Sequence, residues 1–310
     1  MSWALVIFAS RETPTTLRQT IDAALVSAGG LARIDVLVNG NVQLAADIAR
    51  SFAETAGMKE SPVRIWSIPL GDKANAWNQY IHQIWAGEDL AFFADGYVRL
   101  NADTVQLLGN GVTADERVLG GCGVPTAGHS AEALRNNLIV NTGFHGNFCC
   151  IKGLVLAQMR DSGIALPVGL YRTDSLMGAF LCYALNPATH VWEDHRILVH
   201  PTASWDVDWV RWWHPRDLIA MVKRYGRQAR GRLENKAIAN HLAIRRQLPQ
   251  RLPTTSKELV LEWAERCPAE FQGVFKRDLL ARRSFLELRN AGSMDAVSFA
   301  PSLVWQGSAR

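Results

Sequence analysis

The sequence predicts an α/β fold: a mixed, mainly parallel sheet flanked by helices, followed by a mainly helical extension. Three observations support this prediction. Short apolar runs alternate with helical periodicity over the first hundred residues, 48% of the 310 residues are hydrophobic, and strand signals fade after about residue 205. A chain of this length and apolar content can bury a sizeable core, which excludes a disordered or low-complexity polymer.

Four apolar runs in the first half predict strands buried on both faces. They cover residues 3–9, 34–38, 63–68 and 90–93, with helical segments between them at about 13–28, 42–56 and 73–85. This β-α-β-α-β-α-β order implies a parallel sheet with helices on both faces. Ligands bind such sheets at the carboxyl ends of the strands, so the residues that follow each run are the ones to examine.

The middle and the end of the chain follow a different pattern. Residues 117–124 and 146–151 predict strands separated by a polar loop over 126–141, and a helix is expected over 173–183. Residues 217–241, 257–266 and 269–289 predict further helices. The sequence therefore predicts a first domain over 1–205 and a helical extension over 206–310.

Cysteines and apolar segments indicate the compartment. The five cysteines form no CxxC pair, so neither a disulfide framework nor a zinc site is expected. The short apolar N-terminus lacks the charged start of a signal peptide, and no apolar run reaches the ~20 residues of a membrane span. We expect a cytoplasmic protein.

The basic charge is concentrated in one segment. Residues 211–251 contain eleven Lys/Arg and two acids, a charge of +9, which leaves −5 for the rest of a chain whose total is +4. Four tryptophans lie just before this segment or at its start: Trp205, Trp209, Trp212 and Trp213. Three interpretations stand: a patch for an anionic membrane surface or lipid-linked acceptor, an arginine that reaches a diphosphate, or a solvated basic helix packed by tryptophan. Without an RNA-binding motif, no nucleic-acid partner is expected.

Several nucleotide-binding classes lack their motifs. No G-x-G-x-x-G, no G-x-x-x-x-G-K-[ST] and no G-x-S-x-G is present, which argues against a dinucleotide Rossmann site, a P-loop NTPase and an α/β-hydrolase. The strands end instead in polar residues, among them Asn39 and Asp95. Such ends suit a nucleotide held by side chains and turns.

At these positions the chain resembles the family-2 glycosyltransferases of the GT-A fold, over about residues 3–203. The resemblance rests on the order and spacing of five segments: Ala9-Ser10-Arg11-Glu12, Val38-Asn39-Gly40-Asn41, Gly71-Asp72-Lys73-Ala74-Asn75-Ala76-Trp77-Asn78, Phe92 to Leu100, and Leu166 to Leu176. It implies an inverting transfer of a sugar from a nucleotide sugar, expected to be a UDP-sugar, to a hydroxyl acceptor on a glycan or lipid-linked glycan. Polysaccharide biosynthesis on the inner face of a membrane would fit this activity.

The resemblance also implies roles for individual residues. Asp174 is expected to be the general base that deprotonates the acceptor hydroxyl, although Thr173-Asp174 alone could simply cap a helix. The family's D-x-D triplet reads Asp95-Gly96-Tyr97 here, so a Mg²⁺ or Mn²⁺ site at Asp95, completed by His200, is in question. The expected donor-binding residues are Ser10, Arg11, Glu12, Asn39, Lys73, Asp95 and Tyr97, and the expected acceptor-binding residues are His145 and Gly146. The basic and tryptophan clusters, rather than the resemblance, add Arg227 on the donor side and Trp205 on the acceptor side.

Two other functions remain open from the sequence. The altered triplet would also fit a catalytically degenerate protein that only binds nucleotide sugars. A nucleotidyltransferase shares the sheet topology but usually has a glycine-rich loop after the first strand, and residues 10–14 contain no glycine. The identity of the sugar and of the acceptor depends on loops whose conformation the sequence does not provide.

Overall fold

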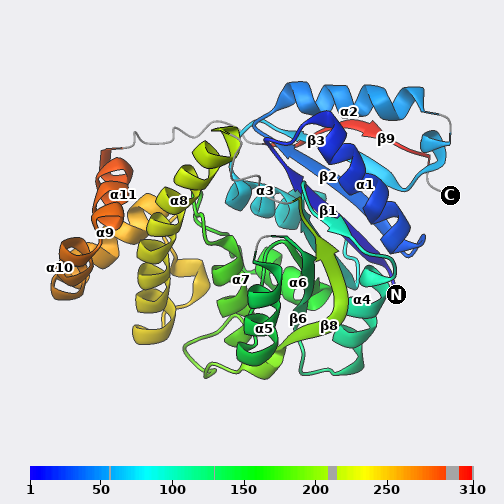
Figure 1. The fold of residues 1–310 in the computed structure, drawn as a ribbon. Helices are drawn as coiled ribbons and strands as arrows, with labels where there is room; N and C mark the ends of the chain where they lie inside the picture. Colours follow the sequence, from blue (N-terminus) through cyan, green and yellow to red (C-terminus); the bar gives the residue numbers. More distant parts are fainter. Residues whose placement is uncertain (56, 129, 209–214, 291–299, 309–310) are drawn as a thin grey trace.

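The computed structural model describes residues 1–55, 57–128, 130–208, 215–290 and 300–308, with side chains described from residue 225 onward in the helix that begins at Pro215. Over these residues one nine-stranded sheet has the order β5-β8-β6-β7-β4-β1-β2-β3-β9 (Figure 1). Its strands are β1 (Trp3–Ala9), β2 (Ala32–Asn39), β3 (Val63–Ile68), β4 (Leu90–Asp95), β5 (Arg99–Leu100), β6 (Gly120–Ala127), β7 (Phe148–Lys152), β8 (Ile197–Asp206) and β9 (Ser302–Gln306).

The sheet is mixed, as predicted, but it is parallel mainly in its N-terminal half. The pairs β1–β2, β1–β4, β2–β3 and β6–β8 are parallel. The pairs β3–β9, β4–β7, β5–β8 and β6–β7 are antiparallel. Strand β1 lies between two parallel neighbours and all of its residues are buried, which explains its uninterrupted apolar sequence.

Helices cover both faces of the sheet, and alternate residues of each strand face different layers. On one face, Leu5 and Ile7 share a buried core with α1 (Pro14–Ala28), α2 (Val42–Glu54) and α4 (Thr104–Ala114). On the other, Val6 and Phe8 join a core with α3 (Lys73–Gln79), which continues as the π-helix η2 (Tyr80–Ile84), and with α6 (Gly153–Asp161) and α7 (Thr173–Cys182). The short 3₁₀ helices are η1 (Met58–Glu60), η3 (Asp194–Arg196) and η5 (Pro249–Arg251).

Side-chain caps begin the three helices that follow β1, β2 and β3. Thr13, Asn41 and Asp72 accept hydrogen bonds from backbone N–H groups in the first turns of α1, α2 and α3, respectively. Such caps satisfy donors that would otherwise lack partners at a helix start. The polar residues after each strand therefore fix where the next helix begins, at the carboxyl edge of the sheet.

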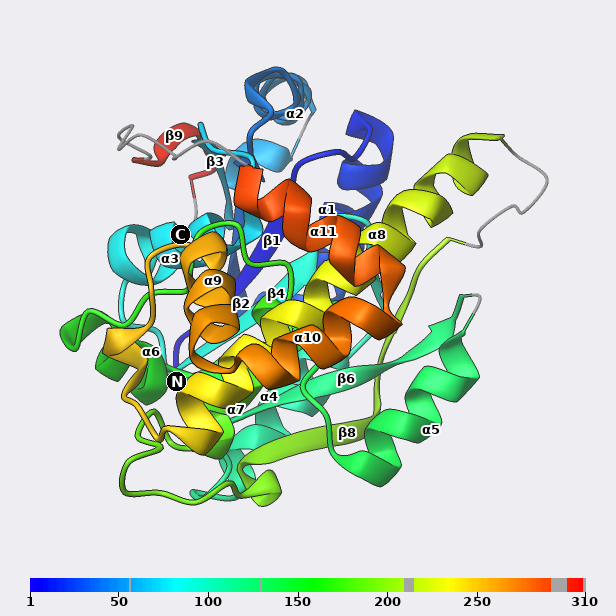
Figure 2. The same cartoon turned by 90° about the vertical axis from the view of Figure 1, so that its left-hand side faces the viewer.

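The C-terminal helices pack as one group beside the sheet (Figure 2). They are α8 (Pro215–Ala239), continued by the π-helix η4 (Asn240–Ile244), α9 (Ser256–Arg266), α10 (Pro268–Arg277) and α11 (Leu279–Asn290). Leu233, Trp263 and Phe285 belong to the same buried cluster as Phe93 of β4. The basic extension is therefore packed onto the core of the first two hundred residues. None of the helices in the described part of the chain is both long and apolar enough to cross a bilayer.

The structure corrects three expectations. Residues 126–141, predicted as a loop, contain α5 (Ala131–Asn141), in which only Leu138 is buried. Residues 269–289 form two helices, because Asp278 interrupts them and caps α11 at Ala281 with a 2.9 Å bond. The segment after residue 206 is mainly helical but also supplies β9, which pairs with β3. The domain boundary at residue 205 stays a prediction.

Candidate functional site

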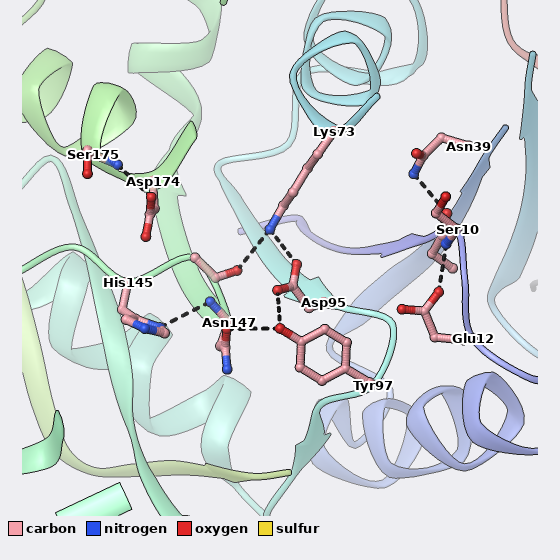
Figure 3. A network of polar contacts seen from close by, with 12 residues as sticks. Ser10, Glu12, Asn39, Lys73, Asp95, Tyr97, His145, Asn147, Asp174 and Ser175 are labelled. Carbon is pink, nitrogen blue, oxygen red and sulfur yellow. Dashed lines mark hydrogen bonds and ion pairs between the residues drawn. The ribbon is translucent and has the colours of Figure 1, made fainter. Parts of the chain in front are cut away.

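Polar residues from several elements gather at the carboxyl edge of the sheet (Figure 3). Asp95 ends β4 and lies opposite Phe8 of β1 in the parallel register. The antiparallel strand β7 begins beside it, and the Asp95 N–H donates to the Asn147 carbonyl at 3.1 Å. This pairing places the segment 145–147 next to the end of β4.

Lys73 provides the positive charge of this site. It is the first residue of α3, and its Nζ forms an ion pair with Asp95 Oδ1 and lies 3.4 Å from the Gly146 carbonyl oxygen. Burial alone would lower the pKa of Lys73, but the charges of Asp95 and then of Asp174 outweigh it, so the pKa is raised. Lys73 is therefore a cation throughout the neutral pH range.

Tyr97 occupies the position of the second acid in the D-x-D triplet. Its hydroxyl donates to Asp95 Oδ2 at 3.0 Å and lies 3.5 Å from Asn147 Oδ1. Both carboxylate oxygens of Asp95 are thus engaged, one by Lys73 and one by Tyr97. Among the residues that the structure describes, no group of three or more His, Cys, Asp or Glu side chains could hold a metal ion. The residues around Asp95 do not form a divalent-metal site by themselves.

Asp174 lies in the first turn of α7, with its side chain 25% exposed. Its Oδ1 accepts the Ser175 N–H at 2.9 Å and lies 3.8 Å from Arg172 Nε. A Cβ placed on Gly146 would lie 3.1 Å from Asp174 Cβ and 3.6 Å from Lys73 Nζ. Lys73 and Asp174 therefore both border the space that a side chain at Gly146 would occupy, and the lack of a side chain there leaves that space open to both.

His145 and Trp205 form one stack behind this space. Their ring centroids are 5.7 Å apart at an angle of 19°, and Trp205 is only 2% exposed. Burial lowers the pKa of His145, and the nearby Asp174 and Asp95 only partly oppose this. We conclude that His145 is neutral at pH 7. Because Trp205 is buried, a sugar could stack on its ring only if the residues that cover it moved. The expected acceptor contact of Trp205 therefore stays a prediction.

The turn after β1 is held by the side chain of one of its own residues, Glu12. Glu12 Oε2 accepts the N–H groups of Ser10 at 2.6 Å and of Arg11 at 2.9 Å. Asn39, 4% exposed, donates from Nδ2 to the carbonyl of Ala9 at 2.8 Å, which ties the end of β2 to the end of β1. These residues lie at the predicted edge, and the contacts observed there order the turn. Their binding of a donor is still a prediction.

A close backbone approach brings the turns after β2 and β3 together. A Cβ on Gly40, whose φ is +68°, would lie 2.3 Å from the Cα of Gly71. Any side chain at position 40 would force these turns apart. Gly71 directly precedes Asp72, the cap of the helix that starts with Lys73, so this contact helps to locate the lysine.

One expected site residue, His200, makes its contacts elsewhere, and the expected donor contact of Arg227 stays a prediction. His200 Nδ1 accepts the Ala203 N–H at 3.1 Å and the Thr202 N–H at 3.4 Å, and the ring lies beside Gly111 of α4. These contacts join residues of β8 and α4, and none of them is with Asp95. Arg227 is half-buried on α8, one turn before Arg230. The side chains of Lys223 and Arg224, like Trp209, Trp212 and Trp213, lie outside the described residues.

Glu234 and the contacts of Arg230 were not predicted from the sequence. The two side chains form an ion pair on α8, with 2.9 Å between Arg230 Nε and Glu234 Oε1. Their i, i+4 spacing is visible in the sequence, and Glu234 is one of two acids among eleven basic residues over 211–251. An acid in such a basic segment was the available signal. The backbone N–H groups that Glu234 accepts from, those of Tyr171 and Arg172, are 63 and 62 residues away.

Comparisons with known proteins support the fold. No family model matches the chain, and no curated protein matches its sequence. Among solved structures, the chain is similar to the mannosyltransferase PcManGT from Pyrobaculum calidifontis in complex with GDP-Man and Mn²⁺, with a TM-score of 0.56 and 14% sequence identity. The similarity covers 92% of this chain and 85% of that one. This chain has a glycosyltransferase-like fold. At that identity, membership of family 2 is not shown.

Proposed function

We propose that this protein is an inverting glycosyltransferase that moves a sugar from a nucleotide sugar to a hydroxyl acceptor. One observation supports it most directly: Lys73 and Asp174 both border the space beside Gly146, at the carboxyl edge of the sheet. The similarity to a mannosyltransferase over 92% of the chain agrees with this assignment.

The two charged groups suit the two ends of such a reaction. Breaking the bond between the anomeric carbon and a diphosphate leaves negative charge on the leaving group, which a fixed cation stabilises. Lys73 is such a cation. The acceptor hydroxyl must lose its proton as the new bond forms, and a carboxylate beside it can take that proton. Asp174 fills this role, and direct attack on the anomeric carbon would invert its configuration.

Asp95 and Tyr97 would set the position of Lys73. Asp95 accepts from both Lys73 and Tyr97, so its carboxylate orients the ammonium group toward the space beside Gly146. No step is routed through a metal, because the side chains around Asp95 do not by themselves form a metal site in the part of the chain that the structure describes. Since the structure of PcManGT contains Mn²⁺ with GDP-Man, donor binding should be measured by calorimetry with EDTA and with added Mn²⁺.

Thermal shift combined with turnover tests the function. Wild type would be screened against UDP- and GDP-sugars, because a bound donor raises the melting temperature according to its concentration over Kd. Asp174→Asn should keep donor binding and lower turnover by about 10² to 10⁴, the usual contribution of a general base. Asp161→Asn is a matched control, since this carboxylate at the end of α6 is 73% exposed and lies outside the site.

Three results would count against the proposal. If Asp174→Asn retains wild-type turnover, Asp174 is not the base. If wild type binds a nucleotide sugar but transfers it to no acceptor in a broad panel, the chain is a nucleotide-sugar-binding protein, the alternative left open by the altered triplet. Release of pyrophosphate from a nucleoside triphosphate would instead indicate a nucleotidyltransferase.

Association with an anionic membrane surface remains a separate prediction. The basic residues 223 and 224 precede the first described side chain of α8, while Arg227 is half-buried. Salt-sensitive binding to anionic vesicles that weakens in the double variant Arg224→Glu/Arg227→Glu would support it. Failure to bind such vesicles at low salt would remove it.

A further inference from the structure

The loop 167–172, which leads directly into Asp174, is held by three separate elements. Residues at the start of α9 pair with it: Val168 donates its N–H to the Thr254 carbonyl at 2.8 Å, and Ser256 donates its N–H to the Val168 carbonyl at 2.9 Å. The other two holds come from α8 and from the cap of α3. The loop is thus fixed by the C-terminal extension as well as by the sheet domain.

Glu234 of α8 binds the last part of this loop. Its Oε2 accepts the N–H groups of Tyr171 at 3.0 Å and of Arg172 at 3.1 Å, while its Oε1 accepts from Arg230. Arg172 is the N-cap residue of α7, and its carbonyl accepts the N–H of Leu176. One carboxylate therefore sets the orientation of two consecutive peptide groups, two residues before Asp174.

Arg230 and Asp72 hold the other part of the loop through Gly169. Arg230 Nη2 donates to the Gly169 carbonyl and to Ser256 Oγ, the latter at 2.6 Å. The Gly169 N–H donates to Asp72 Oδ2 at 3.0 Å, and Asp72 also caps the helix that begins with Lys73. A single residue, Gly169, thus links the helix of Lys73 to α8.

General stability is a weak explanation for this arrangement. Glu234 is 0% exposed, and burial raises the pKa of its carboxyl although Arg230 and the two N–H groups oppose the shift. A buried ion pair often contributes less to stability than apolar residues of similar volume, because both charges lose their hydration. What apolar residues could not do is accept two backbone N–H groups and fix the direction of the loop.

We propose that Glu234 and Arg230 are positioning residues for Asp174, which would make the C-terminal extension a part of the active-site framework. This inference rests on the proposed function, in which Asp174 is the base. Neither side chain is assigned a contact with substrate. They act through the loop 167–172, and Arg230 further couples that loop, at Gly169, to the helix of Lys73.

The test compares Glu234→Gln and Arg230→Lys with wild type. Glu234→Gln keeps the size of the side chain, but its amide places N–H donors against Arg230 or against the loop amides. Arg230→Lys is milder: it keeps the charge but cannot donate to Glu234, Gly169 and Ser256 with one fork. Glu262→Gln is the matched control, since it breaks an ion pair with Arg245 in the same extension.

We expect both test variants to lower kcat by about 10- to 100-fold, the usual effect of a small misplacement of a catalytic group. Donor Kd should stay within about twofold, because the variants displace the loop of the base and leave the Lys73–Asp95 pair in place. Amide hydrogen exchange at Tyr171 and Arg172 should accelerate in Glu234→Gln. Glu262→Gln should leave kcat and both amides unchanged.

The outcomes separate this inference from the proposed function. If wild type transfers sugar and the folded variants keep its kcat, the positioning role is overturned while the function stands. If donor binding and kcat fall together, the effect is a general loss of structure and the inference is also overturned. If wild type transfers no sugar, the proposed function fails first. Unchanged exchange at the Tyr171 and Arg172 amides in Glu234→Gln would then also overturn the hold of Glu234 on the loop 167–172.

Discussion

The ion pair between Lys73 and Asp95 can be measured by a double-mutant cycle. The variants are Lys73→Met, Asp95→Asn and the combination, and the measurement is the free energy of unfolding in urea. At an effective dielectric constant of 20, two unit charges 4 Å apart interact by about 4 kcal/mol, which is an upper bound here. The side chains are 31% and 15% exposed, so solvent screens part of this interaction. Exposed pairs contribute about 0.2 to 1 kcal/mol.

We therefore expect a coupling energy of about 1 to 2 kcal/mol, between the values for exposed and buried pairs. The pair Arg283–Glu287 is the control, because its side chains are 78% and 63% exposed and it should couple by about 0.3 to 0.5 kcal/mol. A Lys73–Asp95 coupling no larger than this control would refute the reasoning. It would mean that Lys73 is not held at Asp95 in solution, and the fixed cation of the proposed mechanism would be lost.

The pH dependence of the same cycle has a definite sign. The pKa of Lys73 is raised above its ordinary value of 10.5 in the folded protein. The folded state therefore binds the proton more tightly than the unfolded state, so the lysine's contribution to stability is complete below pH 10.5 and is lost as the pH rises through the folded pKa. The stability difference between wild type and Lys73→Met should not fall between pH 7 and 9.

Three further predictions follow from the site and the core. Gly146→Ala should lower turnover while the protein stays folded, because its Cβ would lie 3.1 Å from that of Asp174. Unchanged kinetics would mean that the segment 145–147 can shift to accept the added methyl group without displacing Asp174. Since burial lowers the pKa of His145, wild type should lose stability as the pH falls below 6.5, and His145→Gln should flatten that slope in thermal unfolding. Of the five cysteines, four are buried and Cys267 is partly exposed, so a thiol reagent should label it first and Cys267→Ser should remove the fast phase.

Strands buried on both faces were predictable because burial favours an apolar residue at every position along them. Residues 3–9 and 90–93 are apolar without interruption, and the structure places them in β1 and β4 at the centre of the sheet. Helix α5 was missed because only Leu138 is buried, so no apolar face repeats with helical period. Helix α4 was missed because Gly109 and Gly111 lie within it, where Trp3 and His200 pack closely.

Only those residues of the candidate site that closely follow an apolar run could be predicted from local sequence patterns. Asp95 and Lys73 were named from their positions after β4 and after β3, and the structure joins them directly. The contact of Asp174 with the space beside Gly146 depends on how β7 and α7 pack, which local patterns do not encode. Glu234 illustrates the limit, since its partners Tyr171 and Arg172 are 63 and 62 residues away.

The pairing of β9 with β3 has a consequence for how the protein is made. Ser302 Oγ donates to the Ser67 carbonyl across 235 residues of sequence, and Trp305 packs edge-on against Phe52 with ring centroids 5.2 Å apart. While a ribosome synthesises those intervening residues, the β1-β2-β3 unit must wait with an unpaired outer strand. Unpaired strand edges are templates for association between chains. Between translation of β3 and arrival of β9, the outer edge of β3 is therefore open to association with other chains.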